Sequence, residues 1–509
     1  MLELVARDKA CEHPDKACHG ESCPLARGFY DRLPQARNAA LEYSMGRTFL
    51  LDKNSLREVA RKHHVCPYYL SQELVRWCDV VVGDYNHYFD LNAMLYGLTI
   101  THQWRVSVLV DEAHNLIERA RKMFTAELDQ ASFRMMCRSA PIALKKVLNR
   151  VNRNWNELHK SQEDVYRVYV AMPEKFMAAL QQAITAVTDY LTDNPAGIHD
   201  ALQRFYFDAM HFSRVNDLFD EHSLFDVTKV MQNPEKRISR NSRTSTVLCL
   251  RNVVPAPFLE QRFVTARSIT LFSATLSPWR FYSDTLGLPK DSAWVDVQSP
   301  FKAEQLRVRI VSNISTRYQH REDSLSPIAD LIFRQYAQRP GNYLAFFSSF
   351  DYLQRVTHLF RTRYPEIPVW EQTRRMEEAE QGAFLERFTT TGQGIGFAVL
   401  GGSFAEGIDL PGERLTGAFI ATLGLPQMNP VNEQIRQRMS AAFNAGYDYT
   451  YLFPGIRKVV QAAGRVIRTQ LDQGIIYLID DRFSRHEVFR LLPKWWKIER
   501  FHNKTKEAR

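Results

Sequence analysis

Runs of apolar residues that end in polar or acidic residues recur along the chain, and they predict buried parallel strands. The clearest run covers residues 105–110 and is followed at once by Asp111 and Glu112. Open α/β sheets place their ligands beyond the carboxyl ends of the strands. Two adjacent carboxylates at such an edge suit Mg²⁺ binding and polarisation of an attacking water. The alternative is a solvated acidic turn, which the following His114 and the motifs further along the chain disfavour.

The second half of the chain repeats this pattern several times. Five apolar segments alternate there with helical stretches: 307–311, 343–347, 396–400, 417–421 and 474–479. That alternation predicts a parallel, doubly wound α/β domain over residues 299–509. Shorter segments at 80–82 and 268–272 predict a further sheet of the same kind.

A long stretch interrupts this second, smaller sheet. Between residues 115 and 255 the apolar positions recur at helical spacing, glycine is nearly absent, and a strand is expected only at 244–250. We therefore predict a helical insertion, with the interrupted domain built from 71–114 and 256–298. Its last strand runs into Ser273 and Thr275, a hydroxyl pair that on its own is also common in turns.

Composition and charge favour a protein that binds a polyanion and disfavour a membrane protein. Lysine and arginine exceed aspartate and glutamate by 66 to 57, and the resulting net charge of +9 suits a polyanionic partner. No apolar run is long enough to cross a bilayer, and the first residues lack the layout of a secretory signal. We expect a cytoplasmic protein that makes no membrane contact.

The seven cysteines are unevenly placed, and four of them fall within residues 1–70: Cys11, Cys18, Cys23 and Cys66. In a reducing compartment such clustering points to a metal site rather than to disulfides. No C-x-x-C pair is present, so the spacing fits an irregular iron–sulfur ligand set better than a zinc ribbon. Zinc stays open as an alternative because histidines are close in sequence: His13, His19, His63 and His64.

A glycine-rich loop follows the expected strand at 396–400. It carries Glu406, Gly407 and Asp409. Glycines allow a backbone to approach a phosphate or ribose closely, while the acids fix the loop. A plain turn is the alternative interpretation.

A cationic segment lies between the last two expected strands. Helical spacing would set Gln461, Arg465 and Arg468 on one face. Two forked guanidinium groups directed to one point suit the charge that develops on a transferred γ-phosphoryl group. The alternative is a surface helix with scattered arginines, which would not require Gln and Gly in this segment.

Taken in order, these motifs resemble a known set. D-E-A-H, S-A-T-L, F-F-S-S at 346–349, G-S-F-A-E-G-I-D-L-P-G and Q-A-A-G-R-V-I-R are similar to motifs II to VI of superfamily 2 helicases. The resemblance is to the iron–sulfur group that includes the xeroderma pigmentosum group D (XPD) helicase and bacterial DinG-type helicases. It spans nearly the whole chain, and the C-P-Y-Y-L-S element before the V-V-V strand is particular to this group.

The resemblance implies an α/β fold with two RecA-like parallel-sheet motor domains, the first incomplete. It also implies an iron–sulfur insertion at 1–70 and a helical Arch insertion at 115–255. Single-stranded and forked DNA would be the partner, threaded between Arch, cluster domain and first motor domain. Translocation would run 5′ to 3′ and depend on ATP, in DNA repair or replication.

The resemblance also implies roles for individual residues. The four early cysteines would hold a [4Fe-4S] cluster, Asp111 would hold Mg²⁺ and Glu112 would activate water. The remaining implied residues contact ATP or couple it to DNA: His114, Ser273, Thr275, Glu406, Gly407, Asp409, Gln461, Arg465 and Arg468.

One departure from the family pattern stands out. The sequence contains no G-x-x-x-x-G-K-[ST] phosphate loop and no Gly-Lys pair at all. The lysine and hydroxyl that grip the β- and γ-phosphates are therefore missing. We expect an N-terminally shortened helicase chain with defective ATP turnover. The alternative is a non-catalytic iron–sulfur protein that binds nucleic acid.

Overall fold

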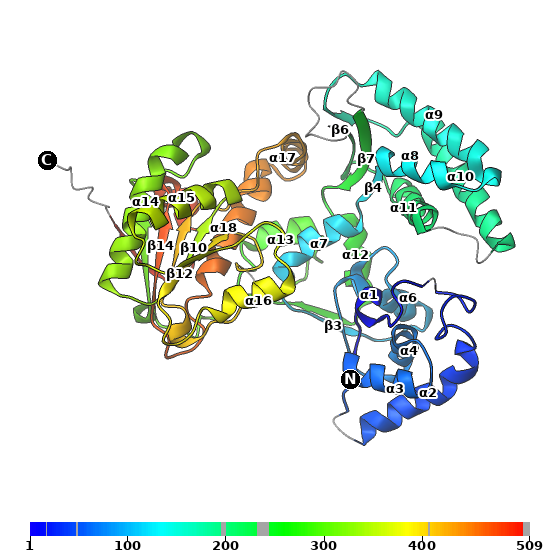
Figure 1. Ribbon diagram of the computed structural model, residues 1–509, viewed down its shortest axis with the longest axis horizontal. Helices are drawn as coiled ribbons and strands as arrows, with labels where there is room; N and C mark the ends of the chain where they lie inside the picture. Colours follow the sequence, from blue (N-terminus) through cyan, green and yellow to red (C-terminus); the bar gives the residue numbers. More distant parts are fainter. Residues whose placement is uncertain (17, 47–48, 195–199, 232–243, 406–407, 502–509) are drawn as a thin grey trace. The chain divides into compact units, whose positions relative to one another are not determined.

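The computed structural model describes residues 1–501 apart from 17, 47–48, 195–199, 232–243 and 406–407 (Figure 1). Residue contacts divide the chain into two compact units. The first unit comprises Met1–Val110 and Asn115–Thr270, and the second comprises Asp111–His114 and Leu271–Arg509. The acidic turn at Asp111–His114 thus belongs to the same unit as the motifs of the second half.

The second unit is built on a seven-stranded sheet. Its strands are β9 (Leu306–Val311), β10 (Asn342–Phe347), β11 (Val369–Glu371), β12 (Gly394–Val399), β13 (Gly417–Ala421), β14 (Gly474–Ile479) and β15 (Lys497–Arg500). The order is β11-β12-β10-β13-β14-β9-β15, and every neighbouring pair is parallel. The five strands predicted here are confirmed, whereas β11 and β15 were not predicted.

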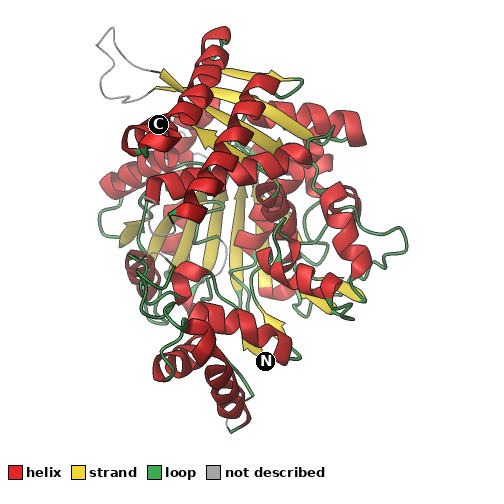
Figure 2. Ribbon diagram, turned by 90° about the vertical axis from the view of Figure 1, so that its right-hand side faces the viewer, coloured by secondary structure: helices red, strands yellow, loops and turns green. Residues whose placement is uncertain are grey.

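Both faces of this sheet are buried. Along β10, Leu344 and Phe346 enter one apolar core while Tyr343, Ala345 and Phe347 enter another, as the two-residue period of a strand requires. The first core also takes α16 (Glu378–Glu386) and α18 (Phe453–Ala463), and the second takes α14 (Arg321–Gln338) and α15 (Phe350–Arg363). Figure 1 labels these helices around the sheet, and Figure 2 shows strands in yellow among red helices. The predicted doubly wound α/β architecture is confirmed.

The second unit contains three further α-helices among its described residues. They are α13 (Trp279–Leu286), α17 (Pro430–Phe443) and α19 (His486–Phe489), and α19 adds Val488 to the first core. The hydroxyl of Tyr449 donates a hydrogen bond of 2.6 Å to the carboxylate of Asp284 in α13. This contact ties the segment before α18 to the segment that follows Ser273 and Thr275.

The first unit contains two small pairs of strands. β1 (Leu2–Glu3) pairs in parallel with β2 (Val81–Val82), and β3 (Ser107–Val110) pairs with β8 (Ser268–Leu271). The strands predicted at 80–82 and 268–272 therefore lie in separate pairs, so the prediction that they share one sheet is wrong. β3 is also mostly exposed, with Leu109 73% exposed, so the prediction of a buried strand there is wrong as well. An apolar core forms between β1 and a group of helices: α2 (Phe29–Met45), α3 (Lys53–Lys62) and α4 (Pro67–Leu74). α6 (Met94–Thr101) adds partly buried residues to this core.

The insertion in the first unit is not wholly helical, so that expectation needs correction. Its described residues form five α-helices: α7 (Leu116–Met123), α8 (Gln130–Ser139), α9 (Lys145–Ser161), α10 (Glu174–Asp193) and α11 (Asp200–Asp217). They are joined by a four-stranded antiparallel sheet in the order β4-β7-β6-β5. Its strands are β4 (Ala126–Asp129), β5 (Tyr166–Tyr169), β6 (Ser223–Met231) and β7 (Thr244–Asn252).

Only β7 of this sheet was predicted. The indole of Trp155 in α9 donates to Thr246 in β7 at 2.9 Å, and both side chains are buried. The helix α12 (Ala256–Thr265) then leads back to β8. Over the described residues, no helix combines the length and the apolar character needed to cross a membrane.

Candidate active site

The turn after β3 carries both acids of the D-E-A-H motif. The backbone N–H of Glu112 donates to the carboxylate of Asp111 at 2.7 Å, and Glu112 adopts a left-handed φ of 46°. The N–H of Ala113 donates to the carbonyl of Phe272 at 3.1 Å, which ties this turn to the end of β8. Both carboxylates are exposed. The acids therefore stand at the carboxyl end of a strand, where the sequence placed them.

His114 lies at the centre of the site and is 1% exposed. Its Nδ1 lies 2.6 Å from the hydroxyl of Ser273 and 3.2 Å from a carboxylate oxygen of Glu112. Its Nε2 lies 2.5 Å from the side-chain nitrogen of Gln461 in α18. One imidazole thus joins three sequence motifs that were predicted to act together.

The protonation state of His114 determines which groups donate and which accept in this hydrogen-bond network. Burial, together with the charges of Arg457 and Arg465, lowers the pKa of His114 to about 4. The ring is therefore neutral at pH 7, with one donor and one acceptor nitrogen. Because Nδ1 faces a carboxylate and Nε2 faces an amide nitrogen, we assign the proton to Nδ1.

The hydrogen bonds then run as a chain. Gln461 donates to His114, His114 donates to Ser273, and Ser273 donates to Glu112 at 3.3 Å. The N–H of Thr275 donates to the Ser273 hydroxyl at 3.2 Å. The hydroxyl oxygen of Thr275 itself is buried and has no hydrogen-bond partner within the described part of the chain. The Thr275 hydroxyl can therefore form a hydrogen bond with a ligand, or with the protein in another conformation.

Arg457 belongs to this site although the sequence reasoning missed it. Its Nη1 donates to the backbone carbonyl of His114 at 2.7 Å, and the residue is 8% exposed. Arg457 also hydrogen-bonds the hydroxyl of Tyr282, which donates to the carbonyl of Thr275 at 3.2 Å. The available signal was its position four residues before Gln461, on the same face of α18.

The two predicted arginines do not lie on a helix, so the helical-face argument for them is wrong. α18 ends at Ala463 and Gly464 is its cap, so Arg465 and Arg468 follow in a turn. The carboxylate of Asp472 accepts the N–H groups of Arg468 and Thr469 at 2.6 and 2.7 Å, which holds this turn. These local hydrogen bonds replace the helical ladder beyond Ala463.

The turn brings both arginines to the glycine-rich loop. Arg465 donates to the carbonyls of Ala405 and Ile408 at 3.2 and 2.9 Å. Arg468 donates to the same Ile408 carbonyl at 2.9 Å and pairs with Asp409 at 3.0 Å. The loop opens at Gly401, whose φ of 81° favours glycine. The predicted residues Glu406 and Gly407 lie outside the described residues.

The four early cysteines are drawn together only in part. Burial raises the pKa of the Cys66 thiol, and the charges of Cys11 and Cys18 add to that rise, so these groups interact electrostatically. Cys66 precedes α4 and accepts hydrogen bonds from the N–H groups of Tyr68 and Tyr69. Nowhere among the described residues are three or more His, Cys, Asp or Glu side chains gathered closely enough to hold a metal ion.

Two family models match the chain. A helicase C-terminal domain model matches residues 332–499, and the DEAD_2 model matches residues 3–133. Among curated relatives, the "ATP-dependent DNA helicase CHL1" of Eremothecium gossypii is 24% identical over 97% of this chain and 68% of its own length. The "ATP-dependent DNA helicase XPD" of Sulfolobus acidocaldarius is 20% identical over 94% of this chain and 82% of its own. In six further relatives the chain spans between 36% and 62% of their length.

Solved structures show the same fold. A structure described as "XPD_Helicase" aligns with 98% of this chain and 86% of its own, with a TM-score of 0.60 and 16% identity. A structure of S. tokodaii Xpd4 aligns with 85% of this chain and 87% of its own, with a TM-score of 0.55 and 17% identity.

Proposed function

We propose that this chain, which belongs to the XPD- and DinG-type superfamily 2 helicases, is the motor of an ATP-dependent DNA helicase. The observation that carries the proposal is the buried contact of His114 with Glu112, Ser273 and Gln461. It connects the acidic turn to the cationic segment through one neutral ring. Such a connection suits a protein that transmits the state of a bound nucleotide between motifs.

The two acids and the two arginines have different roles in ATP hydrolysis. Asp111 would hold Mg²⁺, because a hard cation prefers carboxylate oxygens and this carboxylate is exposed at a strand end. Bound Mg²⁺ neutralises developing charge on the phosphates. Glu112, hydrogen-bonded through Ser273 to His114, orients and polarises water. Arg465 and Arg468 stabilise charge on the γ-phosphoryl group after exchanging some of their carbonyl contacts for phosphate oxygens.

A [4Fe-4S] cluster on Cys11, Cys18, Cys23 and Cys66 is part of this proposal. The donor chemistry fits, since the charges of Cys11 and Cys18 reach Cys66 and two backbone N–H groups already point at its sulfur. These hydrogen bonds oppose the effect of burial without offsetting it, so the pKa of Cys66 stays raised. Iron would supply the positive charge that holds the thiolate form. When bound, the cluster would brace the loop of residues 11–66.

The remaining features of the proposal concern DNA. The insertion at 115–255 would act as the Arch domain, and single-stranded DNA would be translocated 5′ to 3′, in repair or replication. The net charge of +9 supports a polyanionic partner. Forked DNA would be the substrate that unwinding requires.

The phosphates of ATP need a phosphate-binding loop. The 509 residues contain no G-x-x-x-x-G-K-[ST] sequence that would form one. Positioning supplies most of the catalysis in phosphoryl transfer. We therefore propose that the 509 residues alone bind single-stranded DNA but turn ATP over far more slowly than a motor with that loop.

The test compares the 509-residue chain with a chimera that carries the phosphate-loop segment of a family member ahead of Met1. ATP hydrolysis is measured with and without single-stranded DNA, and Glu112→Gln in the chimera is the matched control. We expect DNA-stimulated hydrolysis by the chimera alone. Turnover on the order of 1 to 100 per second by the unmodified chain would overturn the dependence on the loop.

A second candidate is a non-catalytic iron–sulfur protein that binds nucleic acid. Inactivity of both chains, with DNA binding intact, would favour it. The buried network at His114 argues against it, because a pure binding protein gains nothing from holding Glu112 in a left-handed turn next to that network.

A further inference from the structure

Arg32 in α2 holds together the two loops that carry Cys23 and Cys66. One amino group of its guanidinium donates to the carbonyl of Arg27 at 2.5 Å and to the carbonyl of His64 at 2.8 Å, and its Nε donates to the same His64 carbonyl at 3.1 Å. Arg27 lies four residues after Cys23, and His64 lies two residues before Cys66. One side chain therefore joins the backbone beside one predicted cluster ligand to the backbone beside another.

The backbone of both loops is shaped to meet this guanidinium. Gly28 has a left-handed φ of 61°, and a Cβ at this position would lie 3.1 Å from Nη1 of Arg32. The glycine thus leaves the space that the guanidinium occupies. His64 has a left-handed φ of 51°, which is uncommon for a residue other than glycine. Such conformations persist where surrounding contacts hold them, and Arg32 supplies contacts to both turns.

Short-range hydrogen bonds carry this restraint to the cysteines themselves. The N–H groups of Ala26 and Arg27 donate to the carbonyl of Cys23 at 3.0 and 3.2 Å, so residues 23–27 form a tight turn. The carbonyl of Cys66 accepts the N–H of Leu70 at 2.9 Å, at the start of α4. The backbone positions of Cys23 and Cys66 are therefore fixed by the protein without a metal.

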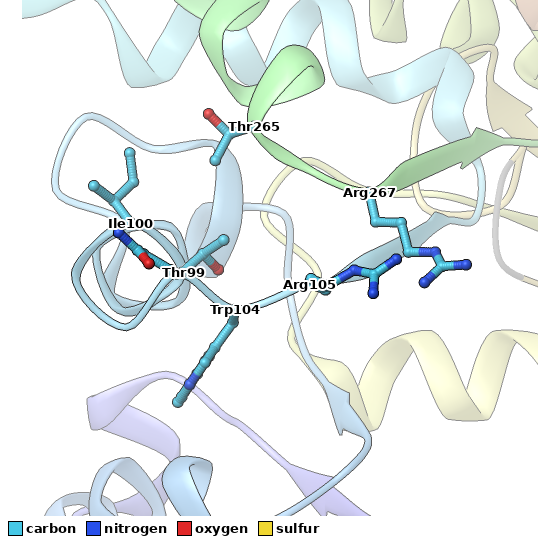
Figure 3. Close-up of a pocket in the computed structure, with 7 residues that line it drawn as sticks. Thr99, Ile100, Trp104, Arg105, Thr265 and Arg267 are labelled. Atoms are coloured by element: carbon cyan, nitrogen blue, oxygen red, sulfur yellow. The ribbon is translucent and has the colours of Figure 1, made fainter.

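The helices that flank the two loops share one apolar core. α2, α3 and α4 all contribute buried residues to it, among them Phe29, three residues before Arg32. Figure 3 shows the indole of Trp104 directed away from Arg105 and Arg267, and Trp104 packs against this same core. Arg32 therefore projects from a helix whose own position is well supported.

Two further arginines restrain the backbone beside Cys11. Glu12 forms ion pairs with Arg57 and, at 3.1 Å, with Arg61, both in α3. The Glu12 carboxylate is mostly buried, with its side chain 19% exposed. Because α3 leads directly into residues 63–66, these ion pairs tie Cys11 to the same helices as Cys66.

We infer that Arg32 is a positioning residue that sets the separation of Cys23 and Cys66 before any metal binds. The inference rests on the proposed function, in which these two cysteines are ligands of the [4Fe-4S] cluster. Ligand loops that are already ordered lose less conformational entropy when a metal binds. Removing Arg32 should therefore loosen the loops and weaken retention of the cluster.

The rate of cluster loss tests this inference on the full 509-residue chain. The protein is purified anaerobically, and the decay of its visible absorbance is followed after air and EDTA are added. Arg32→Ala should lose absorbance about tenfold faster than the unmodified protein, the low end of the effect of residues that orient metal ligands. Arg32→Lys should recover part of the difference, because an ammonium group can still donate to these carbonyls. Equal decay in all three proteins would overturn the inference.

Arg37→Ala is the matched control from the same helix. Arg37 pairs with Glu73 at 3.3 Å, near the end of α4 that is distant from Cys66, and its guanidinium lies 4.6 Å from the ring centre of Trp77. This variant should lower the urea midpoint of the apoprotein while its cluster decays at the unmodified rate. Decay as fast as in Arg32→Ala would assign Arg32 to general stability and would contradict a positioning role.

Crosslinking of the metal-free protein separates this inference from the proposal of a cluster. Dibromobimane fluoresces when both of its arms have reacted with thiols, and trypsin releases Cys23 and Cys66 on the peptides 17–27 and 63–76. With Cys18→Ser in every protein, we expect a crosslink between these peptides, and most of it should be lost when Arg32→Ala is added. A protein that takes up no iron but shows this loss would contradict the cluster and support the positioning role. Equal crosslinking with and without Arg32, or no crosslink at all, would overturn the positioning role.

Discussion

Arg457 donates a hydrogen bond of 2.7 Å to the backbone carbonyl of His114, although the two residues are 343 positions apart in the chain. The contact fixes the turn that carries Asp111 and Glu112 to the helix that carries Gln461. Because Arg457 bonds a backbone carbonyl, this contact does not depend on the side chain of residue 114.

Replacing Arg457 by alanine should leave a buried carbonyl without its partner. Such a group costs about 1 to 3 kcal/mol, so the denaturant midpoint of the second unit should fall. In the chimera with a phosphate loop, ATP turnover should fall as well, because Gln461 and Glu112 lose their common anchor. Arg457→Lys should restore part of both, while the exposed Arg490→Ala serves as a control. Unchanged turnover in Arg457→Ala would show that the contact is only structural.

The pKa of His114 predicts a pH dependence of stability. The folded value of about 4 lies below the ordinary value of 6.5, so between these values the unfolded chain binds a proton that the folded chain does not. Stability is therefore fully present above pH 6.5 and decreases as the pH falls toward 4, by up to about 3 kcal/mol from this group.

The measurement is urea unfolding at pH 7.5 and pH 5.0 for the protein and for His114→Asn. The variant lacks the titrating ring, so its stability should change less between the two pH values. An identical pH dependence in both proteins would contradict the assignment of this loss to His114.

Arg465→Ala and Arg468→Ala should each reduce ATP turnover of the chimera by a factor on the order of 10³, the low end of arginine-finger effects. Binding of single-stranded DNA should persist, because it rests on phosphate contacts elsewhere. Fluorescence anisotropy with a labelled oligonucleotide measures binding beside a coupled ATPase assay. The exposed Arg490→Ala is the matched control, since it removes an arginine outside the site. Parallel loss of both activities would assign the arginines to structure.

Purification under anaerobic conditions should give a brown protein with about four irons per chain, as a [4Fe-4S] cluster requires. Cys18→Ser or Cys66→Ser should remove colour and iron, whereas Cys137→Ser, outside the set, should not. Iron analysis and the visible spectrum decide the matter. Stoichiometric zinc without visible absorbance would rule the cluster out.

In the seven-stranded sheet, strands with continuous apolar runs were predictable because burial on both faces requires apolar residues at successive positions. The run at 105–110 also forms a strand, but β3 is mostly exposed, so its burial was not predictable in this way. β10 and β14 are buried throughout and were predicted nearly to the residue. β11 has only three residues and β15 is mostly exposed, so neither carries that mark. In the insertion, β6 is buried only in its first half, and its pairing with β5 and β7 depends on partners far away in the sequence.

The candidate site was predictable in its residues more than in its geometry. Asp111, Ser273 and Gln461 were predicted from short motifs, and His114 does bring their segments together. The geometry around Arg465 was not predictable from helical spacing, because the helix ends at Ala463 and the side chain of Asp472 closes the turn beyond it. A side chain that satisfies backbone groups locally competes with helical hydrogen bonds, and spacing rules do not register it.

The left-handed backbone conformation of Glu112 lowers the stability of the folded chain, whereas the proposed ATP hydrolysis needs the carboxylate of Glu112. A non-glycine residue in that conformation costs roughly 1 to 2 kcal/mol, and asparagine tolerates it better than glutamate does. A screen that selects only for heat resistance should therefore accept Asn or Gly in place of Glu112. A screen that selects for ATP-driven work should reject both, which marks the turn as a place where the chain keeps a strained residue for the sake of its carboxylate.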